Sequence, residues 1–374
     1  MIPVRCACGR NYQARPEHAG KSIRCACGRH VPIPGRTSRW RYPLPLPPRI
    51  GRAITLLGWG WAAVVVTAIL VLWGLGDRWW PATLLLYGPR WPLLLPAPVL
   101  LLAALLVQPR LAIPVVAGAG LGLVFLMGYR TGWRPGGSFG GPATLRIVTF
   151  NMQGGQNALA PDVPLALSEY TPDLALIQEC APAVDALRGL GSDWHFRRDG
   201  SLCLLSRMPV DSVRVHESIQ TREDGMTGLA VVYFLPLQGR PAAVANVHLE
   251  TPRRGLEGIR YRGQSGSLSR NILLRDAGSQ RVSRWLTAQA ADLVVGGDFN
   301  LPVESAIFRR HWGGCPSAFS TRGRGLGYTR ILPNWSARID HVLTCGGRWE
   351  AVNAFVGGDA GSDHLPLVVD LRER

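Results

Sequence analysis

The longest uncharged apolar stretch, Ile54–Gly74, limits the possible folds more than any other feature of the chain. Its 21 residues are enough for a helix to cross the hydrocarbon core of a bilayer. It begins more than fifty residues into the chain, so a cleaved signal peptide fits poorly. The alternative is a hydrophobic bundle buried in a soluble protein. We expect a transmembrane helix here.

Two shorter apolar runs follow, Trp91–Val107 and Leu111–Gly128, with Gln-Pro-Arg at 108–110 between them. The mean hydropathy of the chain is +0.09 and only 18% of its residues are charged, which agrees with part of it lying in lipid. We therefore expect three transmembrane helices within residues 53–129. The lipid bilayer would be the first partner of such a multi-pass membrane protein.

Positive charge is concentrated before and among these apolar runs. Residues 1–142 contain 16 Lys and Arg but 2 acids, whereas residues 143–374 contain 25 and 23. The C-terminal part therefore lacks the basic excess typical of nucleic-acid binding. Five arginines in the Pro/Arg linker 36–52 precede the first apolar run, so the positive-inside rule predicts a cytoplasmic N-terminus. Three crossings would then place residues 129–374 on the periplasmic side of a bacterial inner membrane.

The first 35 residues contain a repeat, VRCACGR and then IRCACGR, with sixteen residues between its two cysteine pairs. The four thiols of Cys6, Cys8, Cys25 and Cys27 suit one tetrahedral Zn²⁺ ion. Segment 1–35 resembles a small zinc ribbon, although such ribbons usually have Cys-x-x-Cys. A disulfide or an unmetallated pair of turns is the alternative. A four-thiolate site agrees with a cytoplasmic N-terminus, because the cytosol is reducing.

Four other cysteines are scattered along the C-terminal part: Cys180, Cys203, Cys315 and Cys345. Cysteines placed in this way are usually small buried hydrophobes. A disulfide among them cannot be assigned from the sequence.

The C-terminal part follows a Gly/Pro linker, 130–143, and alternates strand-like runs with helical stretches. Its length is enough for one sizeable α/β domain, which we place at 144–374. Within it, VVGGDFNLPVES begins as an apolar strand and reaches two glycines before Asp298 and Asn300. We expect the glycines to let the chain turn and present both side chains.

Polar residues recur where apolar runs of this domain begin or end: Asn151, Glu179, His248, Asp298, Asn300, Asp340, His341, Asp363 and His364. Taken singly, most acids at strand ends are turn caps and most lone histidines are structural. Together they predict one rim of a sheet with oxygen ligands for Mg²⁺ and histidines for phosphate contact or proton transfer.

The motifs TFNMQ, LIQE, NVHLE, GGDFN, RIDHV and SDHLP occur in this order across the domain. The order resembles the endonuclease/exonuclease/phosphatase superfamily, of which deoxyribonuclease I is the type. The resemblance implies a four-layer αββα sandwich with its site at one end of the packed sheets. It also implies hydrolysis of a phosphate ester with Mg²⁺ or Mn²⁺.

The resemblance implies a metal site at Asn151 and Glu179, with Glu179 the principal ligand and Asp363 completing the environment. His341 stands where the family often has an aromatic residue, and we assign it no role.

The resemblance also implies catalytic roles. Asp298 would orient or deprotonate the attacking water, and Asn300 would hold a phosphoryl oxygen. Asp340 would orient His364, which would stabilise or protonate at the phosphate. His248 would contact the scissile phosphate.

The substrate is the least determined feature. Arg253 and Arg254 lie in TPRRGLEGIRYRGQ, which we interpret as a phosphate-contacting loop or, alternatively, a solvated one. Phosphate esters of nucleic acids, nucleotides and lipid head groups all remain candidates. A membrane tether favours a lipid head group or an extracytoplasmic nucleotide. The rival function is a non-catalytic signalling or scaffold protein whose α/β domain binds ligand and whose zinc ribbon binds a cytoplasmic partner.

Overall fold

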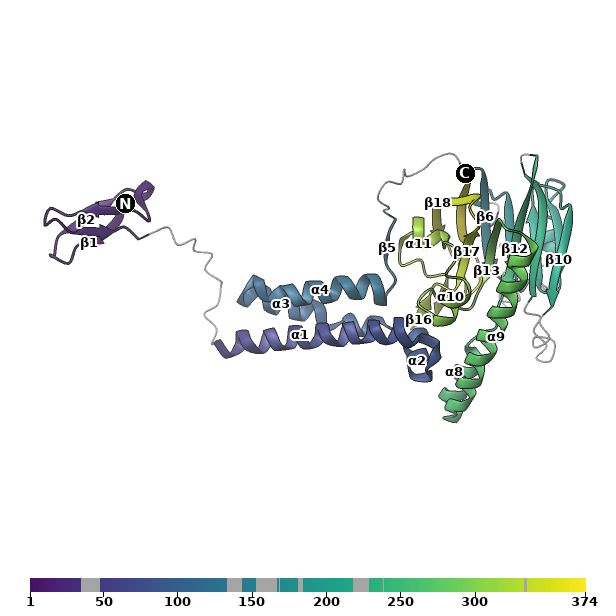
Figure 1. Cartoon of the computed structure of the whole chain (residues 1–374), viewed down its shortest axis with the longest axis horizontal. Coiled ribbons are helices and arrows are strands. Elements are labelled where there is room, and N and C mark those ends of the chain that lie inside the picture. The colour runs from purple at the N-terminus through teal and green to yellow at the C-terminus, as the bar shows by residue number, and fades with distance from the viewer. Residues whose placement is uncertain are drawn as a thin grey trace. The chain divides into compact units, whose positions relative to one another are not determined.

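The computed structural model describes residues 1–34, 48–132, 143–152, 167, 169–180, 184–217, 229–237, 239–332 and 335–374 (Figure 1). They form two compact units. One joins Met1–Gly58 with Leu100–Ile113, and the other joins Trp59–Val99 with Pro114–Arg374. The predicted linkers at 36–52 and 130–143 lie largely outside the described residues.

The N-terminal segment consists of two β-hairpins, one for each copy of the repeat. Their strands are β1 (Ile2–Arg5), β2 (Asn11–Ala14), β3 (Ser22–Arg24) and β4 (His30–Pro32). Each Cys-Ala-Cys-Gly forms the turn of its hairpin, where Gly9 and Gly28 have φ of +89° and +84°. The repeat therefore places two similar cysteine turns in one small fold.

Apolar helices follow: α1 (Pro48–Leu70), extended by a π-helical turn at Val71–Leu75, then α2 (Trp80–Tyr87), α3 (Pro96–Val107) and α4 (Ile113–Leu121), extended by Gly122–Leu126. By length and composition, Arg49–Arg78 and Pro109–Leu126 are able to cross a membrane. The pair Trp80–Tyr87 and Trp91–Val107 adds a third span only if its 78° bend lies within one crossing. The structure therefore supports two of the three predicted spans directly.

Two mixed sheets make up the C-terminal domain. The six-stranded sheet has the order β18–β19–β6–β7–β9–β8, and the five-stranded sheet has the order β10–β11–β12–β13–β17. The strands of the first sheet are β6 (Leu145–Asn151), β7 (Leu174–Gln178), β8 (His195–Asp199), β9 (Leu202–Ser206), β18 (Trp349–Val356) and β19 (Leu367–Glu373). Those of the second are β10 (Ser212–Glu217), β11 (Leu229–Leu237), β12 (Arg240–His248), β13 (Leu293–Asp298) and β17 (Asp340–Cys345). Short ladders pair β5 (Arg130–Thr131) with β14 (Arg324–Gly325), and β15 (Arg330–Leu332) with β16 (Trp335–Ala337).

The main core lies between the two sheets, where side chains such as Ile147, Leu176, Tyr233 and Val244 are fully buried. The helices of the domain are α6 (Val184–Arg188), α8 (Arg253–Arg262), α9 (Ser265–Gln289), α10 (Ala306–His311) and α11 (Ala318–Arg322). Helices α9 and α10 pack on the outer face of the five-stranded sheet, and α6 on that of the six-stranded sheet. The layers thus run helix, sheet, sheet, helix, as in the predicted sandwich.

Two parallel strand pairs bring the functional side chains to one end of the domain. β6 pairs with β7 so that Asn151 lies opposite Gln178, and β12 pairs with β13 so that His248 lies opposite Asp298. Within each parallel pair, the carboxyl ends of both strands lie at the same edge of their sheet. A hydrogen bond from Asn151 to Asp298 joins these two edges, so all four strand ends lie close together.

Two local predictions were wrong. The segment containing Arg253 and Arg254 is helix α8 rather than a loop. Asp340 and His341 begin strand β17 instead of ending an earlier run.

Candidate active site

Strand β13 presents Asp298 at this end of the sandwich, and its two glycines permit the close packing that this requires. A Cβ on Gly297 would lie 1.9 Å from the carbonyl oxygen of Val247 in β12, and one on Gly296 would lie 2.5 Å from Cδ1 of Leu176 in the facing sheet. Both glycines lie inside the strand, so their interpretation as turn residues was wrong. They are required for close approach.

Asp298, Asp340 and His364 form a buried cluster of two carboxylates and an imidazole. Nδ1 of His364 lies 2.9 Å from Oδ2 of Asp340, and Nε2 lies 3.9 Å from Oδ2 of Asp298. Burial alone would lower the pKa of His364, but the charge of Asp340 and its hydrogen bond raise that pKa to about 9. Burial, followed by the charge of Asp340, raises the pKa of Asp298. A raised carboxyl pKa suits a general base.

Asn151, Glu179 and His248 complete the group around Asp298. Nδ2 of Asn151 donates to Oδ2 of Asp298 at 3.0 Å and to Oε1 of Glu179 at 3.3 Å. Nε2 of His248 lies 3.7 Å from Oδ2 of Asp298 and 3.8 Å from Oε1 of Glu179. Residues from both sheets therefore converge on one point, although they are far apart in the sequence.

Backbone strain is concentrated at the same place. Glu179 and Asn300 have φ of +54° and +52°, and Thr171 is the one other described non-glycine residue with positive φ. Asn tolerates this left-handed region, but Glu seldom adopts it. Such conformations cluster at functional sites because the surrounding structure must enforce them.

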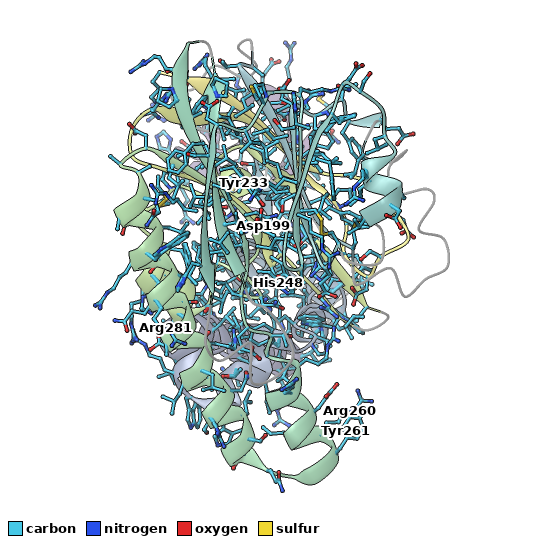
Figure 2. All side chains as sticks on the ribbon, turned by 90° about the vertical axis from the view of Figure 1, so that its right-hand side faces the viewer. Asp199, Tyr233, His248, Arg260, Tyr261 and Arg281 are labelled. Atoms are coloured by element: carbon cyan, nitrogen blue, oxygen red, sulfur yellow. A yellow bond between two sulfur atoms is a disulfide. The ribbon has the colours of Figure 1, made fainter. Side chains whose placement is uncertain are left out.

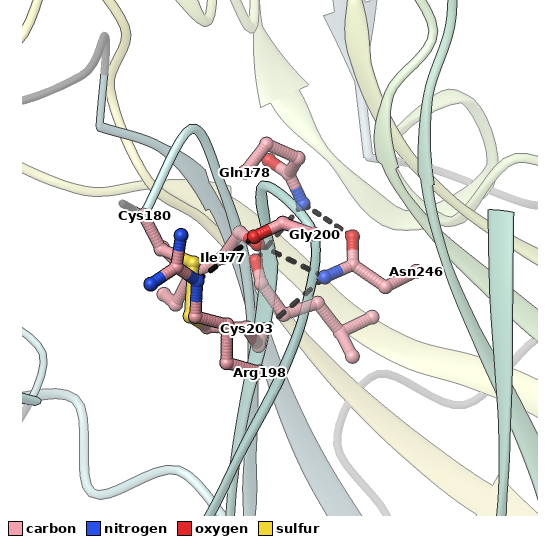
Figure 3. The surroundings of a disulfide bond; sticks show 8 residues. Ile177, Gln178, Cys180, Arg198, Gly200, Cys203 and Asn246 are labelled. Atoms are coloured by element: carbon pink, nitrogen blue, oxygen red, sulfur yellow. Dashed lines mark hydrogen bonds between the residues drawn. A yellow bond between two sulfur atoms is a disulfide. The ribbon is translucent and has the colours of Figure 1, made fainter. Parts of the chain in front are cut away.

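The two chain neighbours of Glu179, Gln178 and Cys180, belong to a buried network between the two sheets (Figure 3). Asn246 donates to the carbonyl oxygens of Ile177 at 3.0 Å and Cys203 at 3.2 Å, and Gln178 donates to Oδ1 of Asn246 at 2.7 Å. The Cys180–Cys203 disulfide joins the residue after Glu179 to β9. A second disulfide joins Cys315 to Cys345. The scattered cysteines are thus paired, which the sequence did not reveal.

A cavity of about 270 Å³ opens over these groups. Its lining consists of Asn151, Glu179, His248, Thr251, Arg253, Arg254, Glu257, Asp298, Asn300 and Arg330. Seven of the sequence-predicted site residues are among them, including both arginines of α8. Among the labelled strand residues in Figure 2, which are Asp199, Tyr233 and His248, His248 lies closest to the labelled residues of α8.

Arg330 is a cationic residue of the site that the sequence reasoning missed. Its Nη1 lies 3.2 Å from Nε2 of His364, and its Nη2 lies 2.5 Å from Oδ2 of Asp363. The predicted metal residue Asp363 therefore makes an ion pair in this structure. Arg330 ends the GYTR stretch, and this arginine at the start of a short strand was the available signal.

Asn300 is held by one contact within the C-terminal domain and by another from the apolar helices. The side-chain amide of Asn300 donates to the backbone carbonyl oxygen of Leu249 at 2.9 Å. The backbone carbonyl oxygen of Asn300 accepts a hydrogen bond from the Tyr87 hydroxyl at 2.9 Å. Arg275 donates in turn to that hydroxyl and lies 3.6 Å from Asp77. Arg275 lies on the long helix α9, and only 2% of the residue is exposed.

His341 lies behind the site with a structural contact. Its Nε2 is 2.8 Å from the carbonyl oxygen of Leu301, and its ring packs against Phe299 and Phe308. Burial, with the charge of Arg338, lowers the pKa of His341 to about 4. The imidazole is therefore neutral at physiological pH.

The donor atoms at the cavity fit a hard divalent cation. The side chain of Glu179 is 33% exposed and contacts the side-chain amide of the buried Asn151. Both residues line the cavity, so their oxygen atoms could coordinate a cation there. The cluster of Asp298, Asp340 and His364 also has ligand atoms within 4.8 Å of one another. Asp340 already accepts a hydrogen bond from His364, which favours Glu179 and Asn151 as ligands.

The sequence profile of the Endonuclease/Exonuclease/phosphatase family matches residues 148–364, and the chain belongs to this family. The match runs from the TFNMQ motif to Asp363 and His364 of the SDHLP motif and confirms the predicted mixed α/β, deoxyribonuclease-I-like fold. No curated protein matches the chain in a sequence search.

Solved structures resemble the catalytic domain at low identity. TDP2 of D. rerio, complexed with a single-strand DNA product, is 17% identical with a TM-score of 0.48, covering 61% of this chain and 98% of its own. The human Nocturnin catalytic domain with bound sulfate is 18% identical with a TM-score of 0.47, covering 63% and 97%. A 3′ phosphatase, NExo from Neisseria, bound to a product DNA hairpin, is 18% identical with a TM-score of 0.46, covering 61% and 99%. Similarity at this level says nothing about the substrate of the present chain.

Proposed function

We propose that this protein is a membrane-anchored, divalent-metal-dependent phosphoesterase. The observation that carries the proposal is the convergence of Asn151, Glu179, His248 and Asp298 on one cavity in a member of this family. A pure binding protein would have no need for a buried Asp340–His364 pair beside a carboxylate of raised pKa.

Each residue has a separate task in this proposal. Asp298 orients the attacking water and accepts its proton, and Asn300 donates to a phosphoryl oxygen. Asp340 holds His364 so that Nε2 faces the phosphate, and His248 contacts the same group. Glu179 and Asn151 would hold Mg²⁺ or Mn²⁺, with Asp363 nearby, and the ion would neutralise phosphate charge.

Metal dependence tests the proposal with a generic substrate. Purified full-length protein in detergent should hydrolyse bis-p-nitrophenyl phosphate with added Mg²⁺ and stop when the chelator EDTA is present. Asp298→Ala should remove the activity. Full activity in the Asp298→Ala protein would refute the assignment of roles.

We propose that the N-terminus is cytoplasmic and the catalytic domain extracytoplasmic. The two sets of cysteines support this topology. The catalytic domain has two disulfides, Cys180–Cys203 and Cys315–Cys345, whereas Cys6, Cys8, Cys25 and Cys27 are free thiols. Disulfides persist in oxidising compartments and thiols in the cytosol. An alkaline phosphatase fusion after Arg374 should be active, and a fusion active only in the cytoplasm would contradict the topology.

We also propose that the four N-terminal thiols hold Zn²⁺. All four sulfur atoms lie within 4.8 Å of one another. The hydrogen bond from the backbone of Cys27, and then that from the Tyr12 hydroxyl, lowers the pKa of Cys25 to about 6, which favours a thiolate ligand. Elemental analysis should find one zinc per chain and none in a variant with all four cysteines replaced by serine.

A further inference from the structure

A second cavity of about 280 Å³ adjoins the catalytic cavity. The two share five wall residues: Thr251, Arg253, Glu257, Asn300 and Arg330. A molecule whose phosphate lies in the catalytic cavity can therefore extend directly into the second one.

The lining of this second cavity combines apolar residues with charged ones, among them Arg253, Glu257, Arg260 and Arg330. Leu256, Leu332, Trp335, Ile339 and the ring of Tyr87 line it. A hydrocarbon chain would gain by leaving water against these apolar side chains, while the arginines of the same cavity would attract a neighbouring anionic group.

The same apolar wall continues into the end of the helical anchor. Leu256 and Trp335 pack against a buried cluster that includes Leu72, Leu86 and Leu126. The rings of Tyr87 and Trp335 lie 6.3 Å apart. A hydrocarbon chain in the second cavity would thus reach the site from the side of the anchor helices.

Aromatic residues mark this end of the anchor as the level of the membrane surface. Trp79, Trp80 and Trp91 are 49%, 37% and 49% exposed. Trp79 directly follows the span Arg49–Arg78, and Trp80 and Trp91 begin the two helices of the bent pair. Tryptophans gather where lipid tails meet head groups. The entrance to the second cavity is near this level, because Trp91 and Trp335 line one adjoining pocket.

Helix α8 supplies positive charge beside the two cavities. Arg253 and Arg260 are exposed on it, and Figure 2 shows Arg260 and Tyr261 at its outer end. Basic residues at membrane level attract anionic lipid head groups. The catalytic domain has no comparable overall excess of positive charge, with 25 basic and 23 acidic residues in 143–374. The basic character is therefore local to the site.

We propose that the substrate is a membrane phospholipid, whose phosphate lies in the catalytic cavity and whose acyl chain enters the cavity of Leu256, Leu332 and Trp335. This inference rests on the proposed phosphoesterase function. The oxygen of water bonds to phosphorus, one P–O ester bond breaks, and the leaving alkoxide takes a proton. Phosphodiester and water thus give a phosphomonoester and an alcohol.

The test compares two substrates with the full-length protein in detergent micelles. One is dioleoylphosphatidylglycerol, whose phosphate and one acyl chain would enter the two cavities under this proposal, and the other is the water-soluble bis-p-nitrophenyl phosphate. Leu332→Asp places a charge on a partly exposed wall residue of the second cavity. We expect it to lower the ratio of the two kcat/KM values, lipid over soluble substrate, by about tenfold to a hundredfold.

Leu273→Asp is the matched control, because Leu273 is 69% exposed on α9 and does not line the second cavity among the described residues. It should leave the ratio at the wild-type value. Hydrolysis of the soluble diester or of single-stranded DNA without hydrolysis of the lipid would overturn the lipid inference and leave the phosphoesterase standing. An equal ratio in both variants would overturn it as well. No hydrolysis of any substrate would overturn the proposed function itself.

Discussion

Two buried polar clusters meet at the segment Asp298–Ser305, and they are built in opposite ways. The catalytic cluster consists of Asn151, Asp298, Asp340 and His364, and it borders the catalytic cavity. The anchor cluster consists of Asp77, Tyr87, Arg275 and Ser305, and joins the end of the first apolar helix to the catalytic domain. The first brings two carboxylates close together beside a cavity, and the second surrounds one carboxylate with hydrogen-bond donors.

The catalytic cluster brings two carboxylates together at a cost in stability. The charge of Asp340 contributes to the raised pKa of Asp298, and no donor among the described residues reaches Oδ1 of Asp340. Buried like charges destabilise a fold unless partners compensate. Their retention beside a cavity is typical of a functional site.

In the anchor cluster, one carboxylate has several partners. Asp77 accepts hydrogen bonds from the Ser305 hydroxyl at 2.6 Å, from the amide of Ala306 at 2.9 Å and from that of Ile307 at 3.2 Å. It also lies 3.6 Å from Nη2 of Arg275. An acid at the first turn of a helix stabilises that helix, here α10. The comparison indicates that the anchor cluster fixes the segment Asp298–Ser305 at its Ser305 end. The catalytic cluster depends on the same segment, because Asp298 begins it.

The largest effect is expected from Asp298→Asn. It should lower the hydrolysis rate by about a thousandfold, because general base catalysis is lost, with little loss of stability, because one of two like charges is removed. Initial rates and thermal unfolding of the same preparation measure both. If the Asp298→Asn protein were also strongly destabilised, Asp298 would support the fold as the anchor cluster does. That result would contradict the distinction between the two clusters.

Asp77→Ala should have its main effect on stability. It leaves Arg275 buried without its charge partner and removes three hydrogen bonds at α10, which we expect to cost about 4 kcal/mol. Denaturant unfolding in detergent measures this cost. Asp185→Ala is a control for a lost ion pair, since Asp185 lies 3.9 Å from Arg188 in exposed positions and its loss should cost much less stability. Equal effects of the two variants would refute the importance of the anchor cluster.

His341 belongs to neither cluster, and we expect it to make the stability of the fold depend on pH. Its pKa of about 4 in the folded state is below its ordinary value of 6.5, so between these pH values the unfolded chain binds a proton that the native protein does not. Stability should therefore fall as pH falls from 6.5 to 4, by about 3 kcal/mol from this residue. In His341→Phe the fall should be smaller by that amount. Parallel stability curves for the two proteins would show that His341 does not titrate in this way.

The smallest effect is expected from Tyr87→Phe. It removes the hydroxyl that donates to the carbonyl oxygen of Asn300 and leaves Arg275 with one partner fewer. We expect about 1 kcal/mol lower stability and a fall in kcat of a few-fold, since Asn300 remains held by Leu249 and Asp298. Unchanged stability and kcat would mean that the anchor does not position Asn300.

The strands and the gathering of polar residues at one end of them were predictable because their signals are local. Apolar runs such as LRIVTF and LALIQ end in polar residues, and short motifs in a fixed order indicated the family. The match to residues 148–364 confirmed the family and the fold. The roles of the individual residues stay predictions.

The anchor cluster and the disulfides were not predictable, because each depends on pairing distant segments. Asp77 stands beside Arg78 in the short segment between two apolar helices, and Arg275 stands in the long helix α9 of the C-terminal domain. Nothing near either residue in the sequence indicates their contact. Helix α8 was missed because its glycines, Gly255 and Gly258, resemble loop residues, although they let α8 pack closely on α9.

The most direct test of the account is the dependence of hydrolysis rate on Mg²⁺ concentration, measured for the full-length protein and for Glu179→Gln. The account predicts a saturable rise in rate for the wild type. It predicts that Glu179→Gln needs at least about tenfold more Mg²⁺ for half its maximal rate, because an anionic ligand is lost. A wild-type rate independent of Mg²⁺, or the same Mg²⁺ dependence in both proteins, would contradict a metal-dependent site at Glu179.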